Sequence, residues 1–441
     1  MLFSKEDLRK LILPLFVEQL LVVAVGMADT IMISSVGEAA VSGVSLVDNI
    51  NILLINIFAA LATGGAVIAG HALGKKDTER ACQAAEQLFF FVALSSVVIM
   101  AAVLLCQDLI LTKVFGKIEA DVMENAQVYL WITALSIPFI AVYNGGAAIF
   151  RVMNNARISM VTSVIMNLIN ICGNALLIYG FGMGVEGAAI PTLVSRVIAA
   201  LLITGLLLKP DLEVRLRRPL PLKLDWQVIK KICHIGVPNG VENSVFQLGK
   251  ILVLSLVTSF GTTAITANAV ANSVGTFQII PGMAINLALI TVCSRCVGAG
   301  DYGQARYYTK LLMKYMYLGI FVVDGLIILL TPLILKAYHL SPETGEVTQR
   351  ILIYIGICTI AIWETSFGLP NTFRAAGDVK YTMCVSMISM WIFRVGFSFI
   401  LGKNLGWGVF GIWVAMTIDW VFRSVLFVIH YIRGGWTRVK V

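Results

Sequence analysis

Long apolar runs separated by short polar connections make up almost the whole hydrophobic pattern of this chain. Most runs reach about 20 residues, the length that an α-helix needs to cross the ~30 Å hydrocarbon core of a bilayer. The connections carry Gly, Pro or charged residues, which end such helices. We predict twelve transmembrane helices, over residues 11–34, 44–71, 80–106, 124–150, 157–180, 187–208, 227–259, 264–292, 306–331, 346–371, 379–402 and 408–432.

The composition agrees with a membrane protein. Of the 441 residues, 58% are hydrophobic and 13% are charged, whereas a soluble domain carries about 25% charged residues. The net charge of +8 is spread over short loops, so it does not indicate nucleic-acid binding. We therefore expect an all-α integral membrane protein. Its first apolar run has full spanning length and should be retained as a helix and not removed as a signal peptide.

The positive charges predict how the chain lies in the membrane. The N-terminus and every second connection after it hold most of the Lys and Arg, with the largest group between Lys209 and Lys231. The opposite connections hold only Lys113, Lys117, Lys336 and Lys403. Because basic loops stay in the cytoplasm, we expect both termini to be cytoplasmic and the protein to reside in the cell membrane.

The two halves of the chain repeat each other. Pro14 and Glu18 match Pro238 and Glu242 at a spacing of 224 residues. Further matches at 223 or 224 residues join Gly74 to Gly298, Asp77 to Asp301, Phe150-Arg151 to Phe373-Arg374 and Gly187 to Gly411. Six helices is an even number, so both halves should share one orientation, as in transporters built from parallel repeats. We predict two pseudo-symmetric six-helix bundles, residues 1–210 and 227–441, joined by a cytoplasmic linker over residues 211–226.

Two acidic residues inside the first predicted helix are the strongest sign of function. Glu18 and Asp29 lie 11 residues apart, which is three helical turns and about 20°, so they share one face. An ionised side chain at mid-membrane costs at least ~2.5–3.5 kcal/mol. This face should therefore meet water, an ion or a cationic ligand.

Other predicted helices also carry polar side chains. The fifth has Asn167, Asn170 and Asn174 at i, i+3 and i+7, on one face. The seventh, ninth and tenth carry further candidates, which are Glu242, Gln247, Asp324 and Glu364. Amides often hold transmembrane helices together, so a structural role for the asparagines is the alternative to ligand binding.

Some charged residues also have a structural interpretation. Glu18 and Glu242 each follow a proline by one turn, so an architectural role in both halves is plausible. Two local pairings are open as well, Glu242 with Lys250 and Arg423 with Asp419. Prolines in or near the spans, at Pro14, Pro138 and Pro238, predict kinks, and a hinge in the first helix would suit a moving element.

Signals typical of an enzyme are missing. Gly70 to Lys75 is one residue short of a P-loop and lacks its Ser or Thr, and the chain holds only four His. No metal or nucleophile constellation is evident. We therefore expect no enzymatic activity and no cofactor.

Several motifs taken together resemble one known family. They are Met27-Ala-Asp-Thr-Ile-Met-Ile-Ser34, Gly74-Lys-Lys-Asp77, Phe150-Arg151 and Phe373-Arg-Ala-Ala-Gly-Asp378. With the duplication, and over essentially the whole chain, they resemble the multidrug and toxic compound extrusion (MATE) family. The resemblance implies two bundles around a central cavity that opens alternately to either side. It also implies export of small organic, mostly cationic compounds in exchange for H⁺ or Na⁺, and we expect a monomer in the lipid bilayer.

The resemblance further implies a site in the first half. The family places a cation-binding or protonatable site on residues that correspond here to Asp29, Asn170, Asn174 and Thr192. Many relatives have Asp where this chain has Asn174, so one negative charge is missing and the case for Na⁺ is weaker. Pro14 matches a family position linked to bending of the first helix.

Additional residues are candidates for binding substrate or for coupling. They are Glu18, Glu242, Gln247 and Glu364. A lipid-linked oligosaccharide flippase of the same superfamily is the nearest alternative function. Such proteins tend to have more cationic cavities, whereas the candidates here are acids and amides.

Overall fold

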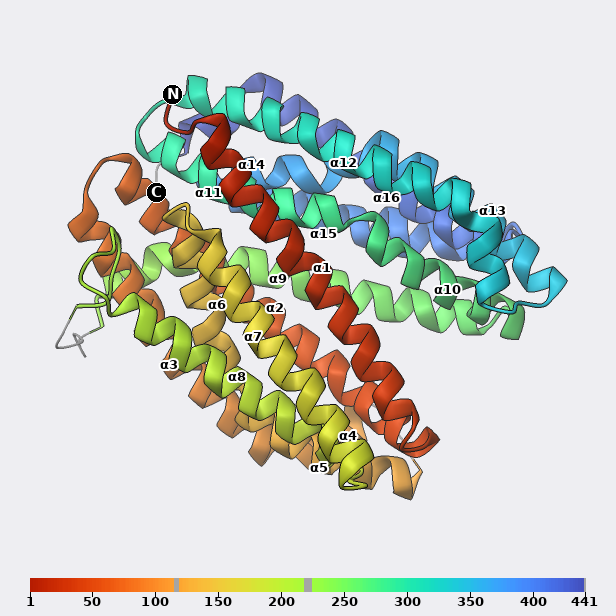
Figure 1. Cartoon of the computed structure of the whole chain (residues 1–441). Coiled ribbons are helices and arrows are strands. Elements are labelled where there is room, and N and C mark those ends of the chain that lie inside the picture. The colour runs from red at the N-terminus through yellow and green to blue at the C-terminus, as the bar shows by residue number, and fades with distance from the viewer. Residues whose placement is uncertain (115–118, 218–223, 440–441) are drawn as a thin grey trace. The chain divides into compact units, whose positions relative to one another are not determined.

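The computed structural model describes residues 1–114, 119–217 and 224–439, and helices make up most of them (Figure 1). No strand occurs among these residues, which confirms the all-α prediction. The basic residues Lys117, Arg218, Lys223 and Lys440, together with part of the predicted linker 211–226, lie outside the described residues.

Most helices match the predicted spans. Those of the first half are α1 (Lys5–Ser34), α2 (Glu38–Gly74), α3 (Thr78–Leu105), α4 (Gln107–Val114), α5 (Ala120–Leu135), α6 (Ile137–Val152), α7 (Ala156–Ala175), η1 (Leu176–Gly180) and α8 (Glu186–Leu207). Those of the second half are α9 (Trp226–Thr258), α10 (Thr262–Gln278), α11 (Ile280–Gly298), α12 (Tyr302–Ala337), α13 (Pro342–Cys358), η2 (Thr359–Gly368), α14 (Leu369–Ala376), α15 (Val379–Ile388), η3 (Ser389–Gly396), η4 (Ser398–Asn404), α16 (Gly408–Arg433) and η5 (Gly435–Arg438).

Eleven helical stretches of the described chain are long and apolar enough to cross a membrane. The count becomes twelve when α5 and α6, which bend by 46° at Ser136, are taken as one span. Pro138 lies in the first turn of α6, where its missing N–H costs nothing. At Pro138, where a kink was predicted, the helix is interrupted between α5 and α6. At Pro14 the helix α1 continues without interruption.

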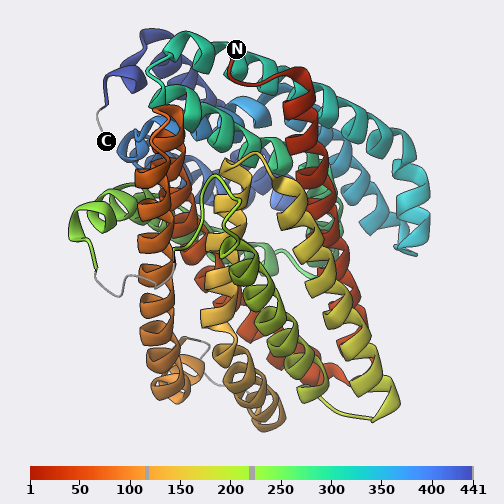
Figure 2. The same cartoon turned by 60° about the vertical axis from the view of Figure 1, so that its left-hand side comes forward.

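The structure separates into two compact units, Ser4–Gly240 (the N-unit) and Val241–Val441 with Met1–Phe3 (the C-unit). Both are bundles of long helices in the two views of Figures 1 and 2. In the N-unit, α2 packs against α3, α5 and α6. In the C-unit, α11 packs against α12 and α14, and α10 packs against α13. The sequence repeat thus recurs as a repeated pattern of neighbouring helices inside each unit.

The turn after the second span shows the repeat in detail. Asp77 caps α3 by accepting from the backbone N–H of Arg80, and Asp301 caps α12 by accepting from that of Gln304. The hydrogen bonds from Gln304 hold the pKa of the Asp301 carboxyl below its usual value. A lowered pKa means that this cap contributes stability at neutral pH and loses it as the pH falls through the lowered value.

The residue before each cap has a left-handed backbone, and this predicts opposite effects of two substitutions. Lys76 has φ 61° and Gly300 has φ 74°. A side chain in this region costs about 1–2 kcal/mol, partly offset by the greater freedom of Gly in the unfolded chain. Lys76→Gly should raise the free energy of unfolding in detergent by about 0.5–1 kcal/mol, and Gly300→Ala should lower it by a similar amount. A Cβ at Gly300 meets no atom within 4 Å, so equal signs for the two variants would refute the backbone argument.

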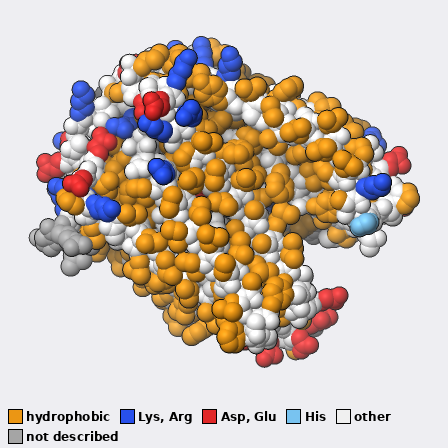
Figure 3. All heavy atoms as spheres, in the orientation of Figure 1, with side chains coloured by type: hydrophobic (Ala, Val, Ile, Leu, Met, Phe, Trp, Pro, Cys, Tyr) orange, Lys and Arg blue, Asp and Glu red, His pale blue; other side chains and the backbone are white. Residues whose placement is uncertain are grey.

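The outer surface is strongly apolar. Figure 3 shows one face on which hydrophobic side chains predominate, with charged side chains in small groups at its margins. Leu13, Val22 and Ile31 of α1 and Leu329 and Leu333 of α12 are among the large apolar side chains that are more than half exposed. Surfaces of this kind are stable against lipid and not against water.

The first three residues pack into the C-unit. The backbone N–H of Phe3 donates to Tyr308 Oη at 3.0 Å, and Tyr308 Oη donates to the Phe3 carbonyl at 2.6 Å. The Leu2 N–H donates to Gln304 Oε1 at 2.7 Å, and the Phe3 side chain is 4% exposed. Tyr431 of α16 donates to the Arg306 carbonyl at 3.3 Å. Residues 1–3 and Tyr431 of α16 therefore lie beside the first turns of α12.

Candidate functional site

Four polar side chains of the N-unit form one hydrogen-bonded chain. Asn174 Nδ2 donates to Asp29 Oδ1 at 2.7 Å and lies 3.5 Å from Asn170 Oδ1. Asn170 Nδ2 donates to Thr192 Oγ1 at 3.0 Å, and Thr192 donates to the Ala188 carbonyl. The structure therefore brings together all four residues that the resemblance assigned to one site.

The helices place these groups by simple periodicity. Asn170 and Asn174 are one turn apart on α7, which packs between α1 and α8, so one face of α7 reaches Asp29 and Thr192 together. Asn174 is 1% exposed and Asn170 is 6% exposed, whereas Asp29 is half-buried. The Asp29 carboxylate thus lies at the more exposed end of this series of hydrogen-bonded side chains, and the asparagines lie deeper in the bundle.

A second acid and a base belong to the same region. Asp48 of α2 and Arg196 of α8 are close enough to Asp29 to interact with it electrostatically. Tyr129 Oη donates to Asp48 Oδ1 at 3.4 Å, and Arg196 Nη1 donates to Ser136 Oγ at 2.7 Å, at the break between α5 and α6. Asp48 was not among the residues predicted from the sequence, although it is an acid inside the predicted span 44–71.

The amide of Asn174 decides what this arrangement can hold. Its Nδ2 points to Asp29 and stabilises an ionised carboxylate by a charge-assisted hydrogen bond. Its Oδ1 is buried and has no hydrogen-bond partner among the described residues. Monovalent metal ions bind oxygen ligands in transporters, so an ion at Asp29 would require this amide to turn over. A proton at Asp29 would require no such change.

Glu18 and Glu242 lie in equivalent ion pairs inside their own units. Glu18 Oε1 is 3.5 Å from Arg151 Nη2, and its Oε2 accepts from Ser159 Oγ at 2.8 Å. Glu242 Oε1 accepts from Arg374 Nη2 at 2.8 Å. All of these carboxylates and guanidiniums are largely buried. The repeated Phe-Arg motif thus supplies the counter-charge to the repeated acid in each unit.

Two local pairings considered from the sequence are not the ones observed. Glu242 pairs with Arg374 and lies 3.8 Å from Arg423, and not with Lys250 of its own helix. Asp419 accepts from Ser389 and lies 3.9 Å from Arg394. These partners come from other helices, and spacing along one helix cannot predict them.

Two further candidates lie elsewhere in the C-unit. Gln247 is half-buried on α9, and Glu364 is completely buried in the π-helical segment η2. Neither is in the N-unit with Asp29.

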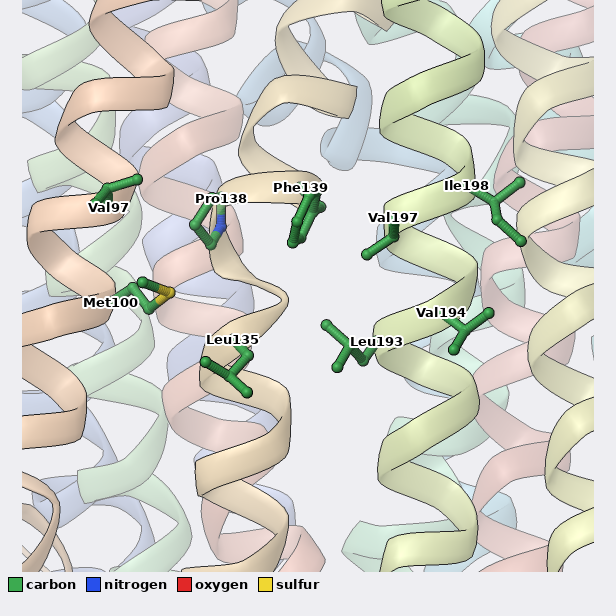
Figure 4. Close-up of a pocket in the computed structure, with 9 residues that line it drawn as sticks. All are labelled: Val97, Met100, Leu135, Pro138, Phe139, Leu193, Val194, Val197 and Ile198. Carbon is green, nitrogen blue, oxygen red and sulfur yellow. The ribbon is translucent and has the colours of Figure 1, made fainter.

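An apolar pocket lies at the break between α5 and α6. It has a volume of about 580 Å³ and is lined by residues of α3, α5, α6 and α8 (Figure 4), namely Val97, Met100, Leu135, Pro138, Phe139, Leu193, Val194, Val197 and Ile198. None of these side chains can recognise a charge. This pocket suits an apolar chain.

A family model matches the chain twice. The MatE model matches residues 14–176 and again residues 238–400. The two matches begin at Pro14 and Pro238, the prolines that opened the repeat in the sequence. This match covers well over half of the chain.

Individual proteins agree with the family model. The chain is 27% identical to "Probable multidrug resistance protein NorM" of Thermotoga maritima, over 98% of this chain and 93% of that protein. It is also 27% identical to "Uncharacterized transporter YisQ" of Bacillus subtilis, over 94% and 91%. Among solved structures, an outward-facing multidrug resistance MATE family transporter of the MOP superfamily has a TM-score of 0.90 at 19% identity, over 98% of this chain and 96% of that chain. The present protein therefore belongs to the multidrug and toxic compound extrusion (MATE) family of multi-pass membrane transporters.

Proposed function

We propose that this protein is a secondary active antiporter that exports organic, mostly cationic compounds in exchange for H⁺ or Na⁺ by alternating access. The observation that supports this most directly is the chain Asp29–Asn174–Asn170–Thr192. It offers one carboxylate that either an inward-moving cation or a cationic compound can neutralise, but not both at once. Occupancy by one then favours release of the other.

We also propose a membrane location and orientation for the protein, based on the distribution of its basic residues. The basic residues of the N-terminus and of alternate connections support cytoplasmic termini in the cell membrane. The polar chain lies within a single copy of the protein, and we propose that the monomer is active.

The driving force is sufficient for this exchange. A monovalent cation that enters down ~100 mV releases ~2.3 kcal/mol, and a tenfold gradient adds ~1.4 kcal/mol. Their sum of ~3.7 kcal/mol can hold a neutral compound at several hundredfold excess outside. One-for-one exchange with a monovalent cationic compound is electroneutral, so only the chemical gradient then drives it.

Efflux from proteoliposomes tests the proposal. Proteoliposomes that contain the purified protein would be loaded with a fluorescent cationic dye. A pH gradient and a Na⁺ gradient would then be imposed separately. Gradient-driven movement of the unmodified dye supports an antiporter and identifies the coupling ion. If neither gradient moves any cationic dye, the proposal fails and a lipid-linked substrate becomes the better candidate.

Asn174→Asp tests whether the lack of a second carboxylate at this site weakens coupling to Na⁺. The substitution replaces the amide donor by a second carboxylate beside Asp29, and two carboxylates with Thr192 form a better oxygen cage for Na⁺. We expect Na⁺-driven efflux to increase by at least about tenfold, a coupling change of ~1.4 kcal/mol. The matched control is Asn167→Asp, on the same face of α7 about two turns away. An equal gain in both variants would mean that added charge, and not this site, is responsible.

A further inference from the structure

Lys250 of the C-unit lies inside a candidate membrane span, α9, without an acidic partner. Its side chain is exposed. Among the described residues, Arg394 of η3 is the one charged group that interacts with Lys250, and it carries the same sign of charge. Basic residues inside membrane spans almost always face a bundle interior or a water-filled cavity and pair with other groups. The missing negative charge beside Lys250 therefore needs a physical explanation.

Two contacts place η3 against the turn of α9 that ends at Lys250. The Cζ atom of Arg394 lies 4.9 Å from the centre of the Phe246 ring, and Phe246 precedes Lys250 by one helical turn. A Cβ added at Gly249 would lie 2.2 Å from Met390 Cε, so the two elements touch directly beside Lys250. The Arg394 guanidinium and the Lys250 ammonium therefore belong to one junction of α9 and η3.

The ion pairs of the C-unit leave positive charge at this junction. Arg394 Nε lies 3.9 Å from Asp419 Oδ2, and Asp419 also interacts with Arg423. The other acid of this series, Glu242, is already 2.8 Å from an arginine of its own. Lys250, Arg394 and Asp419 together carry one net positive charge. An unbalanced charge inside a membrane span is costly, so the junction favours the binding of an anion.

The face of α9 that carries Lys250 is polar. Asn243 and Gln247 precede Lys250 by seven and three residues, so the three side chains share one side of the helix. Both amides are half-buried, and each has N–H groups that can donate to an oxygen. Gln247, a candidate for substrate binding from the sequence, thus lies one turn from the unpaired ammonium.

The repeat shows that packing does not require these cations. At a spacing of 224 residues, Lys250 corresponds to Gly26 and Arg423 corresponds to Ala199. The N-unit therefore builds the equivalent helices with small uncharged residues at both positions. The positive charge at this junction is an addition specific to the second half.

We propose that Lys250 and Arg394 form a binding site for the carboxylate of an organic compound, so that the exported compounds include amphipathic acids and zwitterions. The guanidinium offers N–H donors in a fixed geometry, and the ammonium offers a compact charge. A single carboxylate neutralises the one net positive charge, whereas a doubly charged phosphate would exceed it. Export of the bound acid rests on the proposed antiport function, but binding of the acid does not.

Binding of two matched dyes to the purified full-length protein tests the site. One dye is a rhodamine with a free carboxylate, and the other is its methyl ester. Fluorescence polarisation in nanodiscs of phosphatidylcholine gives each Kd without a gradient. Lys250→Met should raise the Kd of the free acid at least about tenfold and that of the ester less than about twofold. Lys231→Met, which removes an exposed lysine from the same helix, is the matched control and should change neither value.

A conservative variant separates charge from packing. Lys250→Arg keeps the positive charge and should retain the preference for the free acid. An equal loss of affinity for both dyes in Lys250→Met, or no loss for either, overturns the proposal. A preference that disappears when phosphatidylglycerol is added to the nanodiscs also overturns it, because a lipid headgroup and not the substrate would then occupy the site.

Gradient-driven efflux of the two dyes is recorded separately from binding. If neither dye is exported while the binding preference persists, the antiport proposal fails and the carboxylate site remains. If antiport holds, Lys250→Met should lower efflux of the free acid and leave efflux of the ester close to that of the unmodified protein. Retention of full free-acid efflux in this variant would contradict a role of the site in export.

Discussion

Asp29→Asn should reduce gradient-driven efflux to the background of empty liposomes, a loss of at least about tenfold, equivalent to ~1.4 kcal/mol or more of coupling. Asp29 is the one carboxyl in the hydrogen-bonded chain with Asn174, Asn170 and Thr192. The substitution keeps the shape of the side chain and removes its ability to ionise, so neither a proton nor a cationic compound can neutralise a charge there. The measurement is dye efflux driven by each gradient in turn.

The control for this variant is Glu38→Gln, which removes an exposed acid from the first turn of α2. It should retain efflux within about twofold, because exposed charges contribute little. If Asp29→Asn keeps full gradient-driven efflux, coupling does not pass through the N-unit chain. The buried acids of the C-unit would then be the remaining carriers of the proton.

Arg374→Ala should destabilise the protein by about 3–5 kcal/mol, because removal of one partner leaves a buried carboxylate without its closest counter-charge. The Arg374 and Glu242 side chains are 12% and 6% exposed and lie 2.8 Å apart. Arg423 is 3.8 Å away and compensates only in part. Unfolding of purified protein in detergent, followed by fluorescence, gives the free energy.

Two comparisons make this prediction specific. Arg151→Ala, the equivalent change in the N-unit, should cost less, because Glu18 is 3.5 Å from its arginine and retains the hydrogen bond from Ser159. Replacing Glu242 and Arg374 together by Met should recover most of the stability. If the double variant is stable and still exports dye, Glu242 is not a coupling residue. If a stable double variant loses efflux, Glu242 takes part in transport.

Features encoded locally were predictable from the sequence. The apolar spans and the asparagine face of α7 follow from periodicity and from the residue types that begin and end helices. The four residues around Asp29 also lie together as the family resemblance implied.

Features that depend on distant parts of the chain were not predictable in the same way. Arg374 and Glu242 are 132 residues apart, and nothing in the spacing along either helix indicates their contact. Asp48 lies close to the predicted start of a span, where an acid is inexpensive, so its proximity to Asp29 was not anticipated.

The chain passes from one unit to the other at two places, between Phe3 and Ser4 and between Gly240 and Val241. At the first, Phe3 is fastened to Tyr308, and Ser4 is already the N-cap of α1, so no spare residue separates the anchor from the helix. At the second, Pro238 removes a backbone hydrogen bond within α9 two residues before the passage. The anchored residues 1–3 and the helix that carries Asp29 are therefore consecutive in the chain although they belong to different units.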